Sequence, residues 1–364
     1  MITKRQYKIL SFFLSRALFF GLGISKIFYY SGNDSWISAI LGMILGTGVL
    51  SLVYLIKKNV NSFDTQLKKG VLGFISKILV ISLAIFCLHD VILALTIMTT
   101  SFLLPLTPPI VIALSVIIAI IYGAYKGINS FAKVAEILMP IAVAIFIFKF
   151  ISGLFISNYS NFFPMIYDTK IGVLKGGLLF TVFSVTPSLL LLILNDTKLS
   201  YKDTISGYFW GSLTIALTLF IVIGIVGPTL AKLFRYPEYM ALKKIRIFDF
   251  IENLENILTF TWLFDLIILG YVSAYNIKRI LSLSFKNLKV KNSGRARVRQ
   301  RRAGLDVIEG VAGLRGHGGN VDRVHMAGED NAHAGIGILL RNTLIAVDKV
   351  HGQDGGLHVK VRHQ

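Results

Sequence analysis

The sequence predicts an all-α membrane protein that crosses the bilayer about eight times. Hydrophobic residues make up 54% of its 364 residues, and the mean hydropathy of +0.68 exceeds that of soluble domains. These residues form runs long enough to cross about 30 Å of hydrocarbon, and most basic residues of the first 291 lie between the runs. The one cysteine, Cys87, excludes a disulfide framework within the chain, so the fold must depend on helix packing.

The apolar runs define the expected membrane spans and their orientation. The runs cover residues 7–30, 35–56, 73–101, 107–125, 132–155, 176–195, 205–228 and 254–277. Basic residues lie at the N-terminus and in every second connection after it, so the positive-inside rule places the N-terminus in the cytoplasm. The first run is too long for a signal peptide and lacks a small-residue cleavage site, so it is expected to remain as a membrane helix.

The first run contains the helix-weakening stretch Gly21-Leu22-Gly23-Ile24. Each glycine costs about 1 kcal/mol in a helix interior, so the helix is expected to be weak here and able to open. Backbone groups exposed by such an opening must be satisfied by protein or by a polar cavity, which is how many secondary transporters build substrate sites. Alternatively, the glycines let a neighbouring helix pack closely.

The sixth run is interrupted by Pro187, which follows Ser184 and Thr186. A proline removes one backbone hydrogen bond and disfavours helix in the residue before it, so a simple kink accounts for the pattern. The position also favours a site, because breaks in the first and sixth spans are what a repeat of five helices produces, and paired breaks indicate a binding site. The candidate ligand-binding residues are therefore Gly21, Leu22, Gly23, Ile24, Ser184, Thr186 and Pro187.

Few charged residues lie inside the predicted spans. They are Arg16, Lys26, Lys77, Asp90 beside His89, Lys149 and Asp265. An isolated charge at mid-bilayer costs several kcal/mol, so such residues are usually paired or functional, although several lie near enough to an interface for their side chains to reach it.

The connection 229–250 is predicted outside but carries five basic residues, unlike the other connections on that side. Leu242, Ile245 and Phe248 recur there at helical spacing. Two structures suit this pattern: an amphipathic helix on the membrane surface, or a loop helix that covers the mouth of the bundle.

A series of short motifs follows the order found in one known family. The motifs are Gly21-Leu22-Gly23-Ile24, Gly32-Asn33-Asp34-Ser35-Trp36-Ile37, Thr107-Pro108, Gly127-Ile128 with Lys133 and Glu136, Phe163-Pro164, Tyr236-Pro237, and Phe250-Ile251-Glu252-Asn253-Leu254-Glu255 with Trp262. None is specific alone. In their order and spacing over about residues 1–285, the chain resembles the spore germination permease family, the B subunits of nutrient germinant receptors within the amino acid-polyamine-organocation superfamily.

The resemblance implies a ten-helix, inverted-repeat transporter fold with the ligand between the broken first and sixth helices. It also implies that the chain senses an amino acid, sugar or nucleoside together with an A-type and a C-type subunit, in the inner membrane of a spore. Several features depart from the family: no proline follows the first motif, Arg16 is an unusual charge in the first helix, and Thr186-Pro187 replace a common glycine and glutamate. The resemblance therefore does not identify the ligand.

Residues 292–364 differ in composition from residues 1–291, the expected transmembrane domain. All 26 Phe, 14 Tyr and 3 Trp precede residue 292, whereas six of the seven His follow it. Without aromatic residues and rich in glycine, the segment is expected to be a cytoplasmic, mostly disordered tail, produced by a frame error or a foreign segment, in place of the family's last two helices. Its histidines lack helical metal-site spacing and a cysteine partner, so no metal is predicted.

Three classes of function compete. The first is a membrane subunit that binds a small nutrient and triggers germination, and the second is an active amino-acid secondary transporter of the same superfamily. The third, a membrane enzyme, is supported only by the pair His89-Asp90, without a nucleophile or metal motif around it, so no enzymatic activity is predicted. The expected partners are the lipid bilayer, a nutrient and the A-type and C-type subunits, with no cofactor and no nucleic acid.

Overall fold

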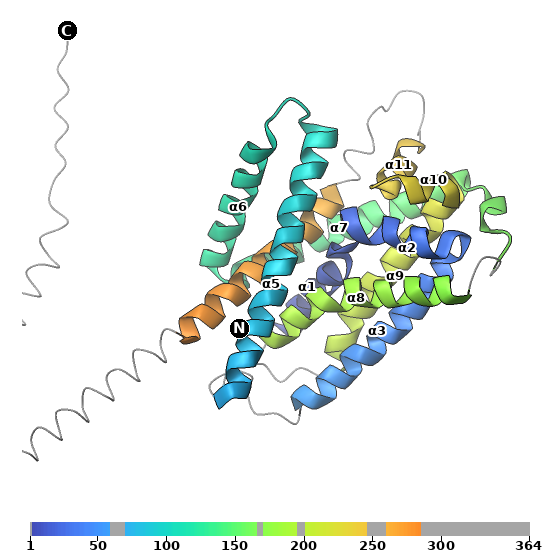
Figure 1. The fold of residues 1–364 in the computed structure, drawn as a ribbon. Helices are drawn as coiled ribbons and strands as arrows, with labels where there is room; N and C mark the ends of the chain where they lie inside the picture. Colours follow the sequence, from blue (N-terminus) through green and yellow to red (C-terminus); the bar gives the residue numbers. More distant parts are fainter. Residues whose placement is uncertain (1, 59–69, 166–169, 195–200, 246–259, 285–364) are drawn as a thin grey trace, which may run out of the picture. The chain divides into compact units, whose positions relative to one another are not determined.

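The described residues of the computed structural model are all helical or connecting loop, which confirms the predicted all-α membrane fold (Figure 1). The structure describes residues 2–58, 70–165, 170–194, 201–245 and 260–284. The predicted tail, 292–364, lies outside these ranges. Within them, seven helices are long and apolar enough to cross a membrane.

The helices follow one another along the chain with short connections. The long elements are α1 (Lys4–Ala17), α2 (Ile24–Ser31), α3 (Ser35–Lys58), α5 (Gly70–Met98), α6 (Pro109–Lys126), α7 (Ile128–Ile156), α8 (Lys170–Leu194), α9 (Tyr201–Val226) and the helix Phe260–Ser284. Two short helices, α10 (Pro228–Leu233) and α11 (Pro237–Lys243), lie in the connection after α9. Short π-helical or 3₁₀ turns cover Phe19–Gly23, Gly32–Asp34, Thr99–Leu103 and Tyr159–Phe162.

The first expected span, 7–30, is not one continuous helix. It is divided into α1 and α2 by the π-helical segment Phe19–Gly23, inside which the backbone leaves helical geometry. After that division, α2 and α3 are joined by the 3₁₀ turn Gly32–Asp34, and the stretch Ile24–Lys57 forms the first of the seven candidate spans. The predicted weak point of the first helix is therefore confirmed as a break.

Glycines bring α3 and α8 into close contact along their length (Figure 1). A Cβ atom on Gly42 would lie 2.5 Å from Cβ of Phe180, and one on Gly46 would collide with the hydroxyl of Tyr208 on α9. Small residues at such positions let membrane helices approach closely. The result is a tightly packed layer of α3, α8 and α9, in which Leu50, Val185 and Tyr208 form a buried cluster.

The N-terminal end of α1 is attached to two other helices. Thr3 and Gln6 form a capping box, and Arg5 pairs with Glu136 of α7 at 3.2 Å. Lys8 pairs with Asp203 of α9 at 3.1 Å. These contacts fix the first half of the broken helix against α7 and α9.

The connection after α9 folds onto the bundle instead of lying free on a membrane surface. Helix α11 packs against α9, and its residues Glu238, Tyr239, Ala241 and Leu242 are buried, as is Ile245 just after it. Phe248 lies outside the described residues. Of the two structures expected for this connection, the helix that covers the bundle is the one present, because its apolar face is buried by protein.

Candidate functional site

The break in the first helix depends on glycine at position 21. Phe20 has an extended ψ of 122° and Gly21 has a φ of +83°, a left-handed conformation that side chains with a Cβ rarely adopt. A Cβ at position 21 would also lie 3.2 Å from the Tyr236 ring. Conformation and close contact therefore both require glycine here.

The other predicted residues of this stretch have different roles. Gly23 is in a helical conformation, with φ −74°, but a Cβ there would approach the rings of Phe19 and Phe183 to 3.0 and 3.3 Å. Leu22 contributes its backbone to the π-helical turn, and Ile24 begins α2 with its side chain buried. Gly23 thus serves packing, whereas Gly21 makes the break.

Aromatic rings surround the break. Phe20 stacks on Trp262 of the helix 260–284, with ring centroids 4.9 Å apart and planes inclined by 26°. Phe19 contacts Phe180 of α8 at 4.7 Å. Tyr236, which precedes α11, covers Gly21 from another side. The opened turn is therefore bordered by protein side chains and, at Gly21, by a cleft, and these are the surroundings in which membrane proteins tolerate non-helical backbone.

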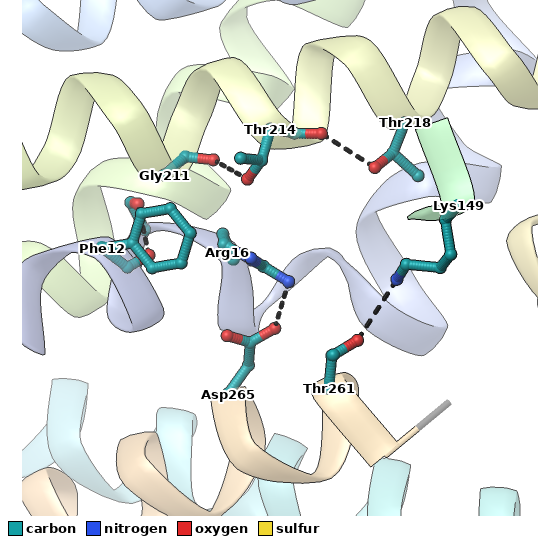
Figure 2. Close-up of polar contacts among 9 residues, drawn as sticks. Phe12, Arg16, Lys149, Gly211, Thr214, Thr218, Thr261 and Asp265 are labelled. Atoms are coloured by element: carbon teal, nitrogen blue, oxygen red, sulfur yellow. Dashed lines mark hydrogen bonds and ion pairs between the residues drawn. The ribbon is translucent and has the colours of Figure 1, made fainter. Parts of the chain in front are cut away.

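Next to the break, Arg16 and Asp265 form a buried ion pair (Figure 2). Nη2 of Arg16 lies 3.0 Å from Oδ2 of Asp265, and the two side chains are 3% and 0% exposed. The guanidinium also lies over the Phe12 ring at 4.9 Å. This pair joins the end of α1 to the helix 260–284. Arg16 and Asp265, both predicted as intramembrane charges, thus neutralise each other.

Lys149 of α7 extends toward the same helix one turn earlier (Figure 2). Its Nζ donates a hydrogen bond to Oγ1 of Thr261 at 3.2 Å and lies 6.0 Å from the Trp262 ring centroid. The hydroxyls of Thr214 and Thr218 on α9 face this region and donate to backbone carbonyls of their own helix. The ammonium therefore lies in a polar region between three helices.

A small cavity of about 30 Å³ separates Lys149 from a second buried charge, Glu238 of α11. Thr218, Trp262, Phe146 and Phe150 contribute to its lining. Glu238 is 2% exposed, and neither of its carboxylate oxygens has a hydrogen-bond partner on another described residue. No ion pair within 4.0 Å joins Lys149 to Glu238 in the described part of the chain. The side chains of Lys149 and Glu238 thus line one cavity without forming an ion pair with each other.

Burial raises the pKa of Glu238 to about 8, although the nearby Lys149 ammonium opposes this shift. Burial likewise raises the pKa of the Tyr236 hydroxyl; Arg235 lowers it, and Glu238 and Asp90 raise it further. Asp90, on α5, is 2% exposed, and its oxygens have no hydrogen-bond partner among the described residues. Charges from α5 and α11 therefore converge on the tyrosine that covers Gly21.

The sixth-span residues do not form a second break. Helix α8 is continuous from Lys170 to Leu194 with Pro187 inside it, so the predicted interruption is wrong. Ser184 donates to the carbonyl of Phe180 at 2.8 Å and Ser188 to that of Ser184 at 3.0 Å, whereas the carbonyl to which an N–H at position 187 would donate is that of Phe183. Ser184 also shares a 2.8 Å hydrogen bond with Tyr208 of α9. Thr186 is half-buried and Pro187 is buried.

The structure thus joins one half of the predicted site to groups that the sequence pattern did not connect. Gly21 and Phe20 lie with Trp262 and Tyr236, while α8 contacts Phe19 through Phe180, one turn before Ser184, and through Phe183, which immediately precedes Ser184. Glu238 had no local signal, because it follows a proline in a polar connection. The adjacent dipeptide Tyr236-Pro237 is one of the family motifs, and it was the sequence feature that could have pointed to Glu238.

Sequence comparisons identify the family of the chain. The family described as spore germination protein matches residues 9–293. YfkT of Bacillus subtilis (strain 168), named as a spore germination protein, is 26% identical over 266 residues, covering 71% of this chain and 72% of YfkT. Spore germination protein XB of Bacillus anthracis is 26% identical over 249 residues, covering 66% of this chain and 69% of that protein. The family match covers most of this chain, which also has the helices of a polytopic membrane protein. The chain therefore belongs to the spore germination permease family.

Proposed function

We propose that this protein is the membrane subunit of a nutrient germinant receptor, which binds a small nutrient at the break in its first helix. In this proposal it acts with an A-type and a C-type subunit in the inner membrane of the spore, with its N-terminus in the cytoplasm. The family supplies the link to germination. The cavity lined by Lys149 and Glu238 is the observation that supports the ligand-binding role, and Trp262, which also lines it, stacks on Phe20 in the break.

The break offers the ligand unpaired backbone groups. The turn around Phe20 and Gly21 departs from helical geometry, so N–H and C=O groups there lose their regular partners. Helix ends carry partial charges that favour an anionic group at an N-terminus and a cationic group at a C-terminus. An amino acid or a similar polar nutrient offers complementary groups.

The side chains of Lys149 and Glu238 favour a ligand that carries both a negative and a positive group. A carboxylate of the ligand would approach the Lys149 ammonium, and a ligand ammonium would approach Glu238 and favour its ionised form, since the Glu238 oxygens have no hydrogen-bond partner on another described residue. Buried charges favour such pairing, since unpaired ones are costly. The cavity is large enough for about two water-sized groups, so a nutrient larger than that requires α11 to move outward.

Ser184, Thr186 and Pro187 remain part of the proposed site as a point at which α8 opens. The proline leaves α8 with one hydrogen bond fewer there. In the packed conformation Ser184 is bonded to Tyr208, so its contact with a ligand requires rearrangement of α8.

The test is a bulky substitution at the break, measured in spores that contain the partner subunits. Gly21→Leu should reduce nutrient-triggered germination, followed as loss of optical density, by about a hundredfold or more in nutrient sensitivity, because the left-handed backbone and the Tyr236 contact exclude a side chain. Gly48→Leu is the matched control, because a Cβ on Gly48 meets no atom within 4 Å.

Equal amounts of both variants in the membrane are needed for the comparison. A normal nutrient response from Gly21→Leu spores would contradict the proposed site. Nutrient uptake by proteoliposomes that contain this chain alone would instead identify it as a secondary transporter.

A further inference from the structure

A second, larger opening reaches the break in the first helix. It is a cleft of about 420 Å³ between α2 and the segment that contains α10, and it is lined by Gly21, Ser25, Lys26, Tyr29, Lys232, Leu233, Phe234 and Arg235. Its volume lies within the range of small-molecule sites. It differs from the cavity beside Lys149 in size and in charge.

The charged side chains that line the cleft are all positive. Every charged residue that lines it is a cation, and the remaining polar side chains are the hydroxyls of Ser25 and Tyr29, which can also donate hydrogen bonds. Lysine and arginine only donate. No carboxylate contributes to the lining.

Of the three cations, Arg235 interacts electrostatically with the buried Asp90 of α5. In the ranges that the structure covers, none of Lys26, Lys232 and Arg235 belongs to an ion pair within 4.0 Å. Arg235 lies over the Tyr236 ring at 5.9 Å. Three like charges around one cleft repel one another, and a bound anion would relieve that repulsion.

We propose that this cleft binds a small, multiply charged oxyanion that presents carboxylate or phosphate oxygens. Arg235 suits two oxygens of one such group, and Lys26 and Lys232 supply further charge from α2 and α10. The site is separate from the proposed nutrient cavity, which is lined by one lysine and one glutamate. Arg235 adjoins Tyr236, whose ring lies against Gly21. By binding Arg235, the anion therefore holds Tyr236 in place over the break.

The experiment measures anion binding by the full chain in nanodiscs of uncharged phosphatidylcholine, with radiolabelled citrate and pyrophosphate as probes. Saturable binding of at least one probe is expected, weakened by added salt. Lys26→Gln and Lys232→Gln should each reduce the affinity about tenfold, since each removes a charge-assisted hydrogen bond. Lys26→Arg and Lys232→Arg should retain it.

Lys133→Gln is the control, because Lys133 is an exposed lysine on α7 outside the cleft. An unchanged thermal midpoint will show that each variant remains folded. A second arm uses nanodiscs of phosphatidylglycerol and native mass spectrometry. A retained lipid that is lost in both glutamine variants identifies a lipid headgroup as the source of the oxyanion.

The two arms have three outcomes. Probe binding in phosphatidylcholine supports a soluble oxyanion, and retained phosphatidylglycerol supports a headgroup. Absence of both, or binding that Lys26→Gln and Lys232→Gln leave unchanged, would overturn the proposal.

Discussion

The first helix and α8 each contain residues that weaken helices, but only the first helix is broken. At Gly21 the backbone is left-handed, whereas α8 remains helical through Pro187. The difference lies in what surrounds each point. Aromatic rings from other elements pack against Phe20 and Gly21, while Pro187 lies in a helix closely packed against α3.

This contrast shows that a helix-breaking residue determines only what the backbone can do. Glycine permits a positive φ, Tyr236 lies 3.2 Å from where a Cβ at position 21 would be, and Trp262 stacks on Phe20 beside it. A proline removes one donor, the N–H that would bond to the carbonyl of Phe183, yet α8 stays helical through Pro187, where it packs against α3. Tertiary contacts decide between the two outcomes.

The largest expected effect tests whether charge holds the broken helix in place. Arg16→Met leaves Asp265 buried without its partner, which should destabilise the protein by about 3–5 kcal/mol. The measurement is the thermal midpoint in detergent. The double variant Arg16→Met/Asp265→Leu should lose much less, because neither charge remains.

Lys8→Met provides the control for that experiment. It removes an ion pair whose lysine is 42% exposed, so a loss of about 1 kcal/mol or less is expected. If Arg16→Met and Lys8→Met had equal effects, the buried pair would not be what holds α1 beside the break.

Much of the fold could be predicted from the sequence, because span length and hydropathy are local properties. The break at Gly21 was also predictable, since two glycines in one apolar run are a local signal. The continuity of α8 was not, because it depends on Gly42 and Gly46, which approach from α3. Arg16 and Asp265 were each recognisable as intramembrane charges, but their pairing joins residues far apart in the sequence.

A smaller effect on stability, which depends on pH, is expected from Glu238, which lines the cavity near the break in the first helix. Burial raises its pKa in the folded protein from 4.5 to about 8, with Lys149 and Tyr236 as neighbouring groups. The folded state therefore retains this proton more strongly than the unfolded state. The stabilisation that this provides is complete below about pH 4.5 and is lost as the pH rises toward 8.

Glu238→Gln removes that titration and keeps a side chain of similar size. The thermal midpoint of the wild type should fall between pH 5 and pH 8 by several degrees more than that of the variant. Parallel pH profiles for the two proteins would show that Glu238 is ionised in the folded protein throughout this range, and that its buried position is not the cause of any pH sensitivity.

The smallest effect is expected at Pro187, where the sequence predicted a break and α8 is continuous. Pro187→Ala restores an N–H that can donate to the carbonyl of Phe183 but removes part of a buried ring. These contributions oppose each other, so stability should change by about 1 kcal/mol or less in either direction. Thermal midpoints of wild type and variant measure this difference.

The nutrient response of the same variant decides whether α8 opens during function. If α8 acts only as a packed wall, Pro187→Ala spores should germinate like the wild type, and the response should depend on Gly21 alone. If stability is preserved but the response is lost, the proline must be needed in a state in which α8 opens near Ser184. In that case the two weak points act as a pair, and the packed α8 represents the conformation without a nutrient.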